Sequence, residues 1–248
     1  MGVTARFETF LSNITLTDAQ RTAGGERREA VIGPLNRHYY ASSSKTSNSV
    51  FIGSWAKRTR IRPPRDVDVL FALPKEVYDR YQGRTGNRQS QSVVPFSAYN
   101  VELIPAFKLT DGKYWICITT DGGSYKTADY DAEANQISTS NTNTNGNTRD
   151  LVKMMKCWQG YCSVPIKSFW LELLSVEFLN PWENRGKSKT YYDWMVRDFL
   201  KYLYGRRNSY VYAPGTGEMM YLGEVWASRA STARPRGKSV QFGRQIPP

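Results

Sequence analysis

Residues 49–74, SVFIGSWAKRTRIRPPRDVDVLFALP, decide the fold of this chain. They hold two apolar, strand-like runs, Val50–Ile52 and Val67–Leu73, separated by a Gly-Ser step and a dense set of cations. Asp66 and Asp68 stand two residues apart, and residues i and i+2 of a strand point to the same face of a sheet. Two carboxylates on one face repel each other unless a cation lies between them, and Mg²⁺ is commonly bound by one or two carboxylates together with substrate phosphates. The stretch therefore predicts a metal site that handles phosphate.

Gly53 and Ser54 precede the two aspartates and favour the same chemistry. A glycine lets a phosphate approach the backbone closely, because it has no side chain in the way. Between Ser54 and Asp66 lie five cations, and two roles stay open for them: they grip a triphosphate or an RNA strand, or they only solvate a loop. They are Lys57, Arg58, Arg60, Arg62 and Arg65.

The whole chain has the composition of a folded, basic protein. Its 248 residues can bury a core, with 40% hydrophobic and 13% aromatic residues. The 34 basic and 22 acidic residues give a net charge of +12. This balance favours polyanionic partners, such as nucleotides, nucleic acid or anionic lipid, without choosing among them; a basic protein with no such partner is the alternative.

Several classes of protein are disfavoured by the sequence. No apolar run approaches the roughly 20 residues of a membrane span, and the first residues lack the apolar region of a signal peptide. Three cysteines, Cys117, Cys157 and Cys162, form no paired framework, which predicts a reducing, cytoplasmic location. The only histidine, His38, is expected to be a packed or surface residue. A zinc site or a histidine-based catalytic triad is therefore disfavoured.

The first half of the chain predicts a helix followed by a mixed α/β region. Residues 3–41 have helical spacing, with a capping box at Thr17 and Gln20. Gly24 and Gly25 predict a kink there, or a helix that depends on tertiary contacts. Further strands are predicted at Val101–Ile104, ended by Pro105, and at Lys113–Thr119, whereas Thr120–Asn147 is polar and predicts a loop with about one helical turn.

Glu102 lies in the first of these later strands. A third carboxylate on a neighbouring strand is what a two-metal site needs to hold both the attacking and the leaving oxygen. Taken alone, Glu102 is an ordinary exposed strand residue; beside the aspartate pair, we interpret it as a third ligand.

The second half of the chain predicts helices. Arg149–Gln159, Pro165–Leu179 and Tyr191–Tyr204 are amphipathic or strongly apolar, and their aromatic and methionine residues are expected in the core. The change in composition places a boundary near Gly146 and predicts two domains, residues 1–146 and 147–248.

Several of these segments together resemble a known family. GSWAKRTRIRPPRDVDVLF resembles the signature of the polymerase-beta-like nucleotidyltransferases, a Gly-Ser step followed by two aspartates two residues apart. More narrowly, the chain resembles the bacterial cyclic-oligonucleotide synthases (CD-NTases) of anti-phage CBASS signalling, relatives of cyclic GMP–AMP synthase and oligoadenylate synthetase. NVELIPAF, DGGSYKTADYDAEANQI with NTNGNTRDLVKMMKCWQ, VPIKSFWLELL and GEVWASRASTA carry this resemblance in family order over residues 15–233. The resemblance implies an α+β fold of two lobes, with a mixed-sheet palm, an N-terminal helix and a C-terminal helical lobe that closes the cleft.

The resemblance also implies roles for individual residues. Asp66, Asp68 and Glu102 match the catalytic and metal-binding acidic triad for Mg²⁺ or Mn²⁺, and Glu102 stands where many members have aspartate. The implied nucleotide-binding residues are Gly53, Ser54, Lys156, Ser163 and Lys167.

The activity that the resemblance implies is the joining of ATP, GTP or other NTPs into a cyclic di- or trinucleotide, with release of pyrophosphate. Implied partners are a regulatory protein or nucleic-acid activator and an effector activated by the cyclic nucleotide. Two alternatives stay open: template-independent addition of nucleotides to RNA, and an inactive nucleotide- or RNA-binding protein. One departure from the family is Pro235, which follows Trp226–Ala230 closely and predicts a shortened closing helix.

Overall fold

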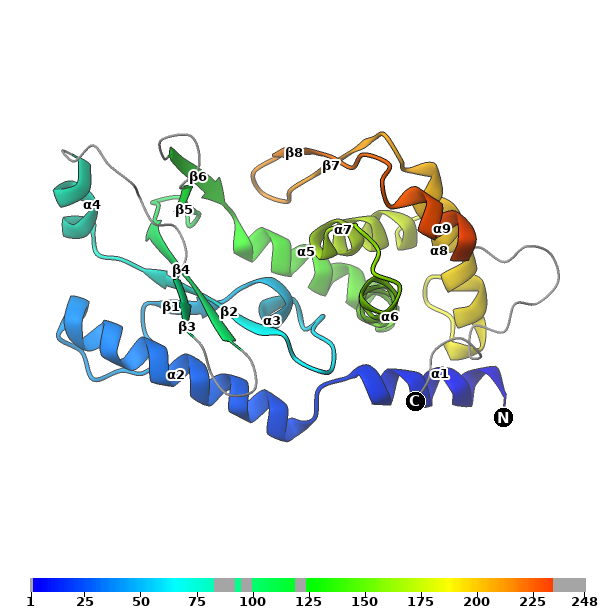
Figure 1. Ribbon diagram of the computed structural model, residues 1–248, viewed down its shortest axis with the longest axis horizontal. Helices are drawn as coiled ribbons and strands as arrows, with labels where there is room; N and C mark the ends of the chain where they lie inside the picture. Colours follow the sequence, from blue (N-terminus) through cyan, green and yellow to red (C-terminus); the bar gives the residue numbers. More distant parts are fainter. Residues whose placement is uncertain (1, 83–91, 95–99, 119–123, 234–248) are drawn as a thin grey trace. The chain divides into compact units, whose positions relative to one another are not determined.

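A computed structural model describes residues 2–82, 92–94, 100–118 and 124–233 of the chain (Figure 1). Its elements are α1 (Val3–Ile14), α2 (Asp18–Tyr40), β1 (Ser49–Phe51), α3 (Gly53–Lys57), β2 (Asp66–Ala72), α4 (Lys75–Gln82), β3 (Ser92–Val94), β4 (Asn100–Lys108), β5 (Tyr114–Ile118), β6 (Ser124–Ala128), α5 (Tyr130–Asn143), α6 (Asn147–Tyr161), α7 (Ser168–Leu179), the 3-10 helix η1 (Lys189–Tyr191), α8 (Tyr192–Gly205), β7 (Tyr210–Tyr212), β8 (Met219–Tyr221) and α9 (Ala227–Ala233). The predicted α+β class is confirmed. The predicted shortening of the closing helix concerns Pro235, which lies outside the described residues.

The chain forms two compact units. The sheet unit comprises Leu16–Arg58 and Pro63–Ala134, and the helical unit comprises residues 2–15, 59–62 and 135–233. The domain boundary near Gly146 concerns a different division of the chain and stays a prediction.

The sheet unit is built on one mixed sheet. Its strands follow the order β1-β2-β4-β5-β6, and β3 pairs with β4 as well. The two central strands, β2 and β4, run parallel, whereas all other pairs are antiparallel. In the parallel pair Asp68 stands directly opposite Glu102. The mixed sheet implied by the family resemblance is confirmed.

The two faces of the sheet differ in what covers them. On one face Val67, Val69 and Phe71 of β2 pack in a core with Ile32 of α2, which runs along the sheet (Figure 1). Because side chains alternate along a strand, Asp66 and Asp68 point to the other face. Leu70 shares that face and packs in a smaller apolar cluster, whose other buried members are Ile52, Ala106 and Tyr114.

Helix α2 is continuous through its two glycines. It begins with the predicted capping box, in which Thr17 and Gln20 exchange hydrogen bonds between side chain and backbone. Gly24 is buried, and a Cβ there would lie 1.9 Å from the Trp55 ring, whereas a Cβ on Gly25 would meet nothing within 4 Å. Gly24 therefore makes room for Trp55, so the helix depends on a tertiary contact, as one of the two sequence interpretations held.

The two glycines should respond oppositely to the same substitution. Gly24→Ala is expected to lower the free energy of unfolding by about 1–3 kcal/mol, because the methyl group overpacks the Trp55 contact. Gly25→Ala is expected to raise it by about 0.5–1 kcal/mol, because alanine suits a helix interior better. Urea unfolding of both variants checks this, and equal effects at the two positions would contradict it.

The prediction of a loop over Thr120–Asn147 is wrong. Within the described part of this stretch, residues 124–128 form β6 and residues 130–143 form the 14-residue helix α5. Asn, Thr and Ser are poor helix formers, but tertiary packing overrides such preferences. Here Ile137 is buried, and Ser140 and Thr144 join Thr148 of α6 in a network of buried hydroxyl groups.

The expected end of a strand at Pro105 is also wrong, because β4 continues to Lys108. The N–H of Leu73 donates to the carbonyl oxygen of Ala106 (2.8 Å), so the backbone polar groups of Ala106 point toward β2. Because these groups alternate along a strand, the backbone nitrogen of Pro105 points toward the opposite edge of β4. On that edge β3 pairs with residues 101–103 and β5 with residues 106–108. The N–H that proline lacks falls between these two pairings.

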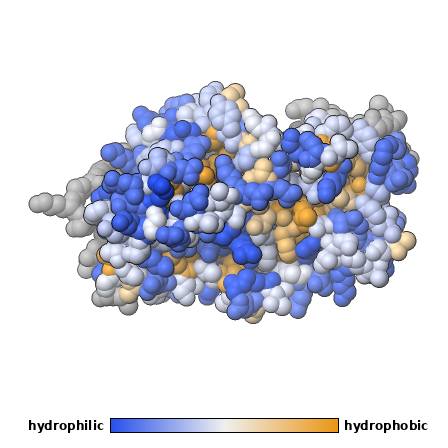
Figure 2. All heavy atoms as spheres, turned by 180° about the vertical axis from the view of Figure 1, so that it is seen from behind, coloured by the Kyte–Doolittle hydropathy of each residue, from blue (hydrophilic) through white to orange (hydrophobic). Residues whose placement is uncertain are grey.

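The helical unit has its own large core. Leu151, Met155, Leu171 and Leu174 are fully buried in it, as is Trp226. The predicted helices in this region are confirmed, except that the one expected from Pro165 begins at Ser168. Among the described residues no helix is long and apolar enough to cross a membrane. Figure 2 shows mostly hydrophilic residues on one face of the molecule.

Candidate metal and phosphate site

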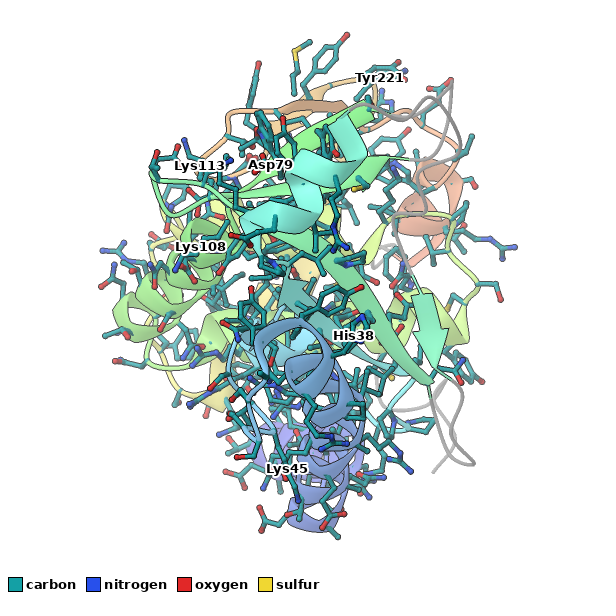
Figure 3. All side chains as sticks on the ribbon, turned by 90° about the vertical axis from the view of Figure 1, so that its left-hand side faces the viewer. His38, Lys45, Asp79, Lys108, Lys113 and Tyr221 are labelled. Carbon is teal, nitrogen blue, oxygen red and sulfur yellow. The ribbon has the colours of Figure 1, made fainter. Side chains whose placement is uncertain are left out.

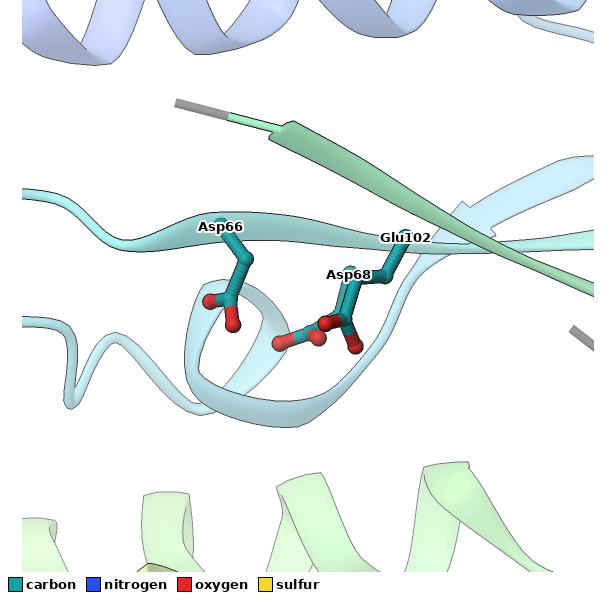
Figure 4. Close-up of side chains that lie close together, drawn as sticks. All are labelled: Asp66, Asp68 and Glu102. Carbon is teal, nitrogen blue, oxygen red and sulfur yellow. The ribbon is translucent and has the colours of Figure 1, made fainter. Parts of the chain in front are cut away.

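Three carboxylates gather on the face of the sheet that α2 does not cover. Asp66 and Asp68 come from β2 and Glu102 from β4, and one carboxylate oxygen of each lies within 4.8 Å of the others. Figure 4 shows the three side chains pointing the same way from the two strands. Their convergence follows from the sheet: residues two apart share a face, and the parallel register sets Glu102 beside Asp68.

The surroundings of this acidic cluster are partly apolar. All three residues are half-buried and border the small apolar cluster of the same face. Tyr130 lies in the first turn of α5. Burial raises the pKa of its hydroxyl, and the negative charges of Glu133 and Asp68 raise this pKa further. Three carboxylates this close together repel one another, because like charges repel at short range.

Gly53 comes directly against the acidic cluster. Its backbone is left-handed (φ +54°), and a Cβ there would lie 2.5 Å from Oδ2 of Asp68. The N–H of Ile52, just before it, donates to the carbonyl oxygen of Asp68 (3.1 Å). Ser54 follows as the second residue of α3 and is half-buried. The Gly-Ser step and the acidic cluster are therefore adjacent in space.

Trp55 holds this turn in place, and sequence reasoning missed it. Its ring stacks on Phe51 with centroids 5.3 Å apart and packs against Gly24, and its Nε1–H donates to the carbonyl oxygen of Asp66 (2.7 Å). A large aromatic residue directly after a Gly-Ser step, itself directly after a strand, was the available signal. Trp55 thus links α2, the Gly-Ser turn and the first aspartate.

Lys57 and Glu133 form a second feature that the sequence did not reveal. The lysine ends α3, the glutamate lies in the first turn of α5, and their charged atoms are 2.6 Å apart with side chains 4% and 13% exposed. Burial of an ion pair makes each charge depend strongly on the other. The pair ties the helix of the Gly-Ser turn to the helix that carries Tyr130. One of the five cations is therefore a structural residue.

The remaining predicted nucleotide-binding residues belong to the helical unit. Lys156 of α6 is buried, and its ammonium group is paired with Glu172 of α7 and donates to Oγ1 of Thr59 (3.0 Å). Ser163 is exposed in the turn after α6, where its φ is +48°. Lys167 is exposed before α7, with its ammonium 5.0 Å from the centroid of the Trp170 ring. Their contact with a triphosphate stays a prediction.

His38 is no part of the acidic cluster. It lies exposed on α2 (Figure 3) and contacts the ring of Tyr39 with centroids 4.6 Å apart. Of the two positions that the sequence left open, packed or at the surface, His38 takes the second.

The donor set of the acidic cluster fits a hard divalent cation. Mg²⁺ and Mn²⁺ take oxygen ligands, and one or two carboxylates with substrate phosphates are the usual protein site for Mg²⁺. One oxygen of each carboxylate lies within 4.8 Å of the others, and the missing side chain of Gly53 lets the turn approach Oδ2 of Asp68 closely. In contrast, zinc sites prefer nitrogen and sulfur ligands, which this cluster lacks.

Residues 1–94 match the family described as the Second Messenger Oligonucleotide or Dinucleotide Synthetase domain. No curated protein matches the sequence.

Solved structures match over most of the chain. Escherichia coli MS115-1 CdnC, solved with ATP, is 18% identical with a TM-score of 0.60, over 87% of this chain and 76% of that one. Vibrio cholerae DncV, a cyclic AMP-GMP synthase solved with nonhydrolysable GTP, is 11% identical with a TM-score of 0.59, over 86% and 80%. Rhodothermus marinus CdnE, a c-UMP-AMP synthase solved with Apcpp and Upnpp, is 14% identical with a TM-score of 0.58, over 92% of both chains.

The fold is therefore that of the CD-NTases. The first 94 of the 248 residues match the second-messenger oligonucleotide or dinucleotide synthetase family. The matched region contains Gly53, Ser54 and both aspartates, whereas Glu102 lies beyond it.

Proposed function

We propose that this protein is a nucleotidyltransferase that joins NTPs into a cyclic di- or trinucleotide second messenger for anti-phage defence. The observation that carries the proposal is the convergence of Asp66, Asp68 and Glu102 beside Gly53 in a chain of this family. The three relatives with solved structures are named with ATP, GTP or nucleotide analogues, and two of them are named as cyclic dinucleotide synthases.

In this proposal the chain's own residues position the reactants. Gly53 and Ser54 receive the donor phosphates, because the Cβ-free turn lets phosphate oxygens approach the backbone. The ribose hydroxyl of a second nucleotide attacks the donor α-phosphorus, pyrophosphate leaves, and a second such step closes the ring. Glu102 has one methylene more than aspartate, so it reaches the cluster from a neighbouring strand with a longer arm.

The acidic cluster would hold the metal ions. Asp66, Asp68 and Glu102 supply the carboxylates for Mg²⁺, or for Mn²⁺ in its place. When bound, a divalent cation there offsets the negative charge that develops on the phosphoryl oxygens.

The helical unit supplies further contacts to the donor in this proposal. Lys167 is exposed and offers a point charge suited to phosphate, and Ser163 offers a hydroxyl four residues before it. Lys156 joins them only if its ammonium leaves Glu172, to which it is now paired.

Partners follow from the same reasoning. The Escherichia coli CdnC has also been solved in complex with HORMA-deltaN, at 18% identity and a TM-score of 0.59 over 82% of this chain and 70% of that one. We propose a regulatory protein or a nucleic acid as activator, an effector activated by the cyclic product, and a cytoplasmic location.

One incubation tests the function. The protein is mixed with labelled ATP, GTP, CTP and UTP and with Mg²⁺ or Mn²⁺, and the products are separated by chromatography. We expect a product that resists phosphatase, because a cyclic nucleotide has no terminal phosphate, and EDTA should abolish it.

Other results of this incubation would contradict the proposal. Extension of an RNA primer, with products that phosphatase attacks, would show an RNA nucleotidyltransferase. Nucleotide binding without any product, also in the presence of a family activator protein or nucleic acid, would show an inactive binding protein.

A further inference from the structure

Four consecutive residues, Thr59–Arg62, lie where the chain passes from the sheet unit to the helical unit and back again. The chain belongs to the sheet unit up to Arg58 and again from Pro63, but Thr59–Arg62 belong to the helical unit. This segment, called the strap here, lies in sequence between the Gly-Ser turn and the aspartate strand. Arg58 ends α3 in a left-handed conformation (φ +57°) directly before it.

The first anchor of the strap is a buried polar network. Thr59 is fully buried, and its hydroxyl donates to Oε1 of Glu172 (2.7 Å) and accepts from Nζ of Lys156 (3.0 Å). Lys156 and Glu172 are 7% and 3% exposed and are paired with each other. A buried ion pair needs its remaining hydrogen bonds satisfied, and the Thr59 hydroxyl supplies one to each partner. The strap therefore enters the seam between α6 and α7.

The second anchor lies three residues on, at the end of α1. The backbone N–H of Arg62 donates to the carbonyl oxygen of Ile14 (2.8 Å), and its guanidinium donates to those of Ser12 (3.0 Å) and Thr15 (2.7 Å). Such carbonyls lack partners inside the helix and attract a cation. Ile61, between the anchors, packs against the core of the helical unit.

The link from the strap to the metal ligands is short and stiff. Only Pro63, Pro64 and Arg65 separate Arg62 from Asp66. Proline fixes its own φ and restricts the residue before it, so this connection has few conformations. On the other side, Thr59 directly follows Arg58, and the turn at Gly53 lies six residues before it.

We propose that the strap positions the reaction centre: the buried network at Thr59 and the cap at Arg62 hold the Gly-Ser turn and the aspartate strand in their reactive geometry. This inference rests on the proposed function. Thr59, Lys156, Glu172 and Arg62 are positioning residues in this view, because they act through the turn and the strand. Lys156 then has a structural role within the helical unit rather than a direct contact with the triphosphate.

Replacement of Thr59 tests the strap. Thr59→Val keeps the shape of the side chain but removes its hydroxyl, and we expect kcat to fall about tenfold, since small misplacements of reacting groups can cost up to about 100-fold. The KM for NTP should change less than twofold. Thr59→Ser restores the hydroxyl and should restore kcat.

Thr144→Val is the matched control. Thr144 is also fully buried in the helical unit, and its hydroxyl bonds to the carbonyl oxygen of Ser140 (2.9 Å) and pairs with the hydroxyl of Thr148 (2.9 Å), but it lies outside the strap. We expect a drop in Tm similar to that of Thr59→Val with no change in kcat. Equal losses of kcat in both variants would overturn the inference, because loss of packing alone would then explain them.

Hydrogen exchange provides a readout that needs no activity. In Thr59→Val the amides of residues 53–58 should exchange roughly tenfold faster than in the unchanged protein, because loss of a hydrogen bond to a charged group shifts a local opening by about this factor. Those amides should be unaffected in Thr144→Val. Unchanged exchange in Thr59→Val would overturn the inference even if the protein made no cyclic product.

The double variant Lys156→Met/Glu172→Met separates the two roles of Lys156. It removes both charges together, so no unpaired charge stays buried. A positioning role predicts a fall in kcat with KM within twofold. A rise in KM of about tenfold at unchanged kcat would overturn the inference for Lys156, because one lost phosphate contact of ~1.4 kcal/mol gives that factor.

Discussion

Replacement of Asp68 by asparagine should reduce nucleotide incorporation by about 100-fold or more, the scale seen when one preorganised electrostatic group leaves an active site. Asp68 is the central member of the acidic cluster: it shares a strand face with Asp66, stands opposite Glu102 and contacts the Gly53 turn. Asparagine keeps the shape but removes the charge that a divalent cation requires.

The same substitution should not weaken the metal-free fold. Two like charges about 4 Å apart repel by roughly 1 kcal/mol in a high dielectric, and Asp68→Asn removes such a repulsion. The free energy of unfolding in EDTA is therefore expected to stay unchanged or to rise by up to about 1 kcal/mol. A ligand that binds the folded state raises Tm, so addition of Mn²⁺ should raise the Tm of the unchanged protein and not that of the variant.

Asp79→Asn is the control for Asp68→Asn. Asp79 lies on α4 (Figure 3), is 52% exposed in its side chain and pairs with Lys75 across one helical turn. An exposed pair of this kind contributes little to stability, because water screens both charges. Activity and the effect of Mn²⁺ on Tm should be unchanged. If Asp68→Asn kept full activity, or if both variants lost the effect of Mn²⁺, the acidic cluster would not be the metal site.

Replacement of Gly53 by alanine should lower activity by up to about 100-fold, because misplacement of reacting groups by 1 Å can cost that factor. The methyl group would lie 2.5 Å from Oδ2 of Asp68, on backbone with a φ of +54°. Either the turn or the carboxylate has to move. The free energy of unfolding should fall by about 1–3 kcal/mol from overpacking and strain.

Gly112→Ala separates the two causes. Gly112 also has a positive φ (+88°), in the turn between β4 and β5, but a Cβ there would meet nothing within 4 Å. It should therefore show the loss of stability from backbone strain and retain activity. Steady-state kinetics and urea unfolding of both variants measure this. If Gly53→Ala were as active as Gly112→Ala, the close approach of the turn to Asp68 would have no catalytic importance.

Sequence reasoning succeeded where the signal was local. The alternation of β2 set Asp66 and Asp68 on one face, and the capping box at Thr17 appeared as predicted. It failed at α5, whose Asn- and Thr-rich sequence has low helix propensity and whose stability comes from Ile137 and the hydroxyl network. The strand was wrongly expected to end at Pro105 for a related reason. A strand tolerates proline where no neighbouring strand needs its missing N–H, and only the pairing of the whole sheet decides this.

The sequence by itself determined the two aspartates, the Gly-Ser step before them and the match of its first 94 residues to a synthetase family. These features depend on residue type and short spacing, and short spacing translates directly into geometry. Only the tertiary structure decided that Glu102 stands beside Asp68, that Gly53 touches the same carboxylate and that Lys156 is paired with Glu172. Each of these contacts joins residues 15 or more positions apart, and strand register and helix packing, which sum many weak interactions along the whole chain, set such contacts.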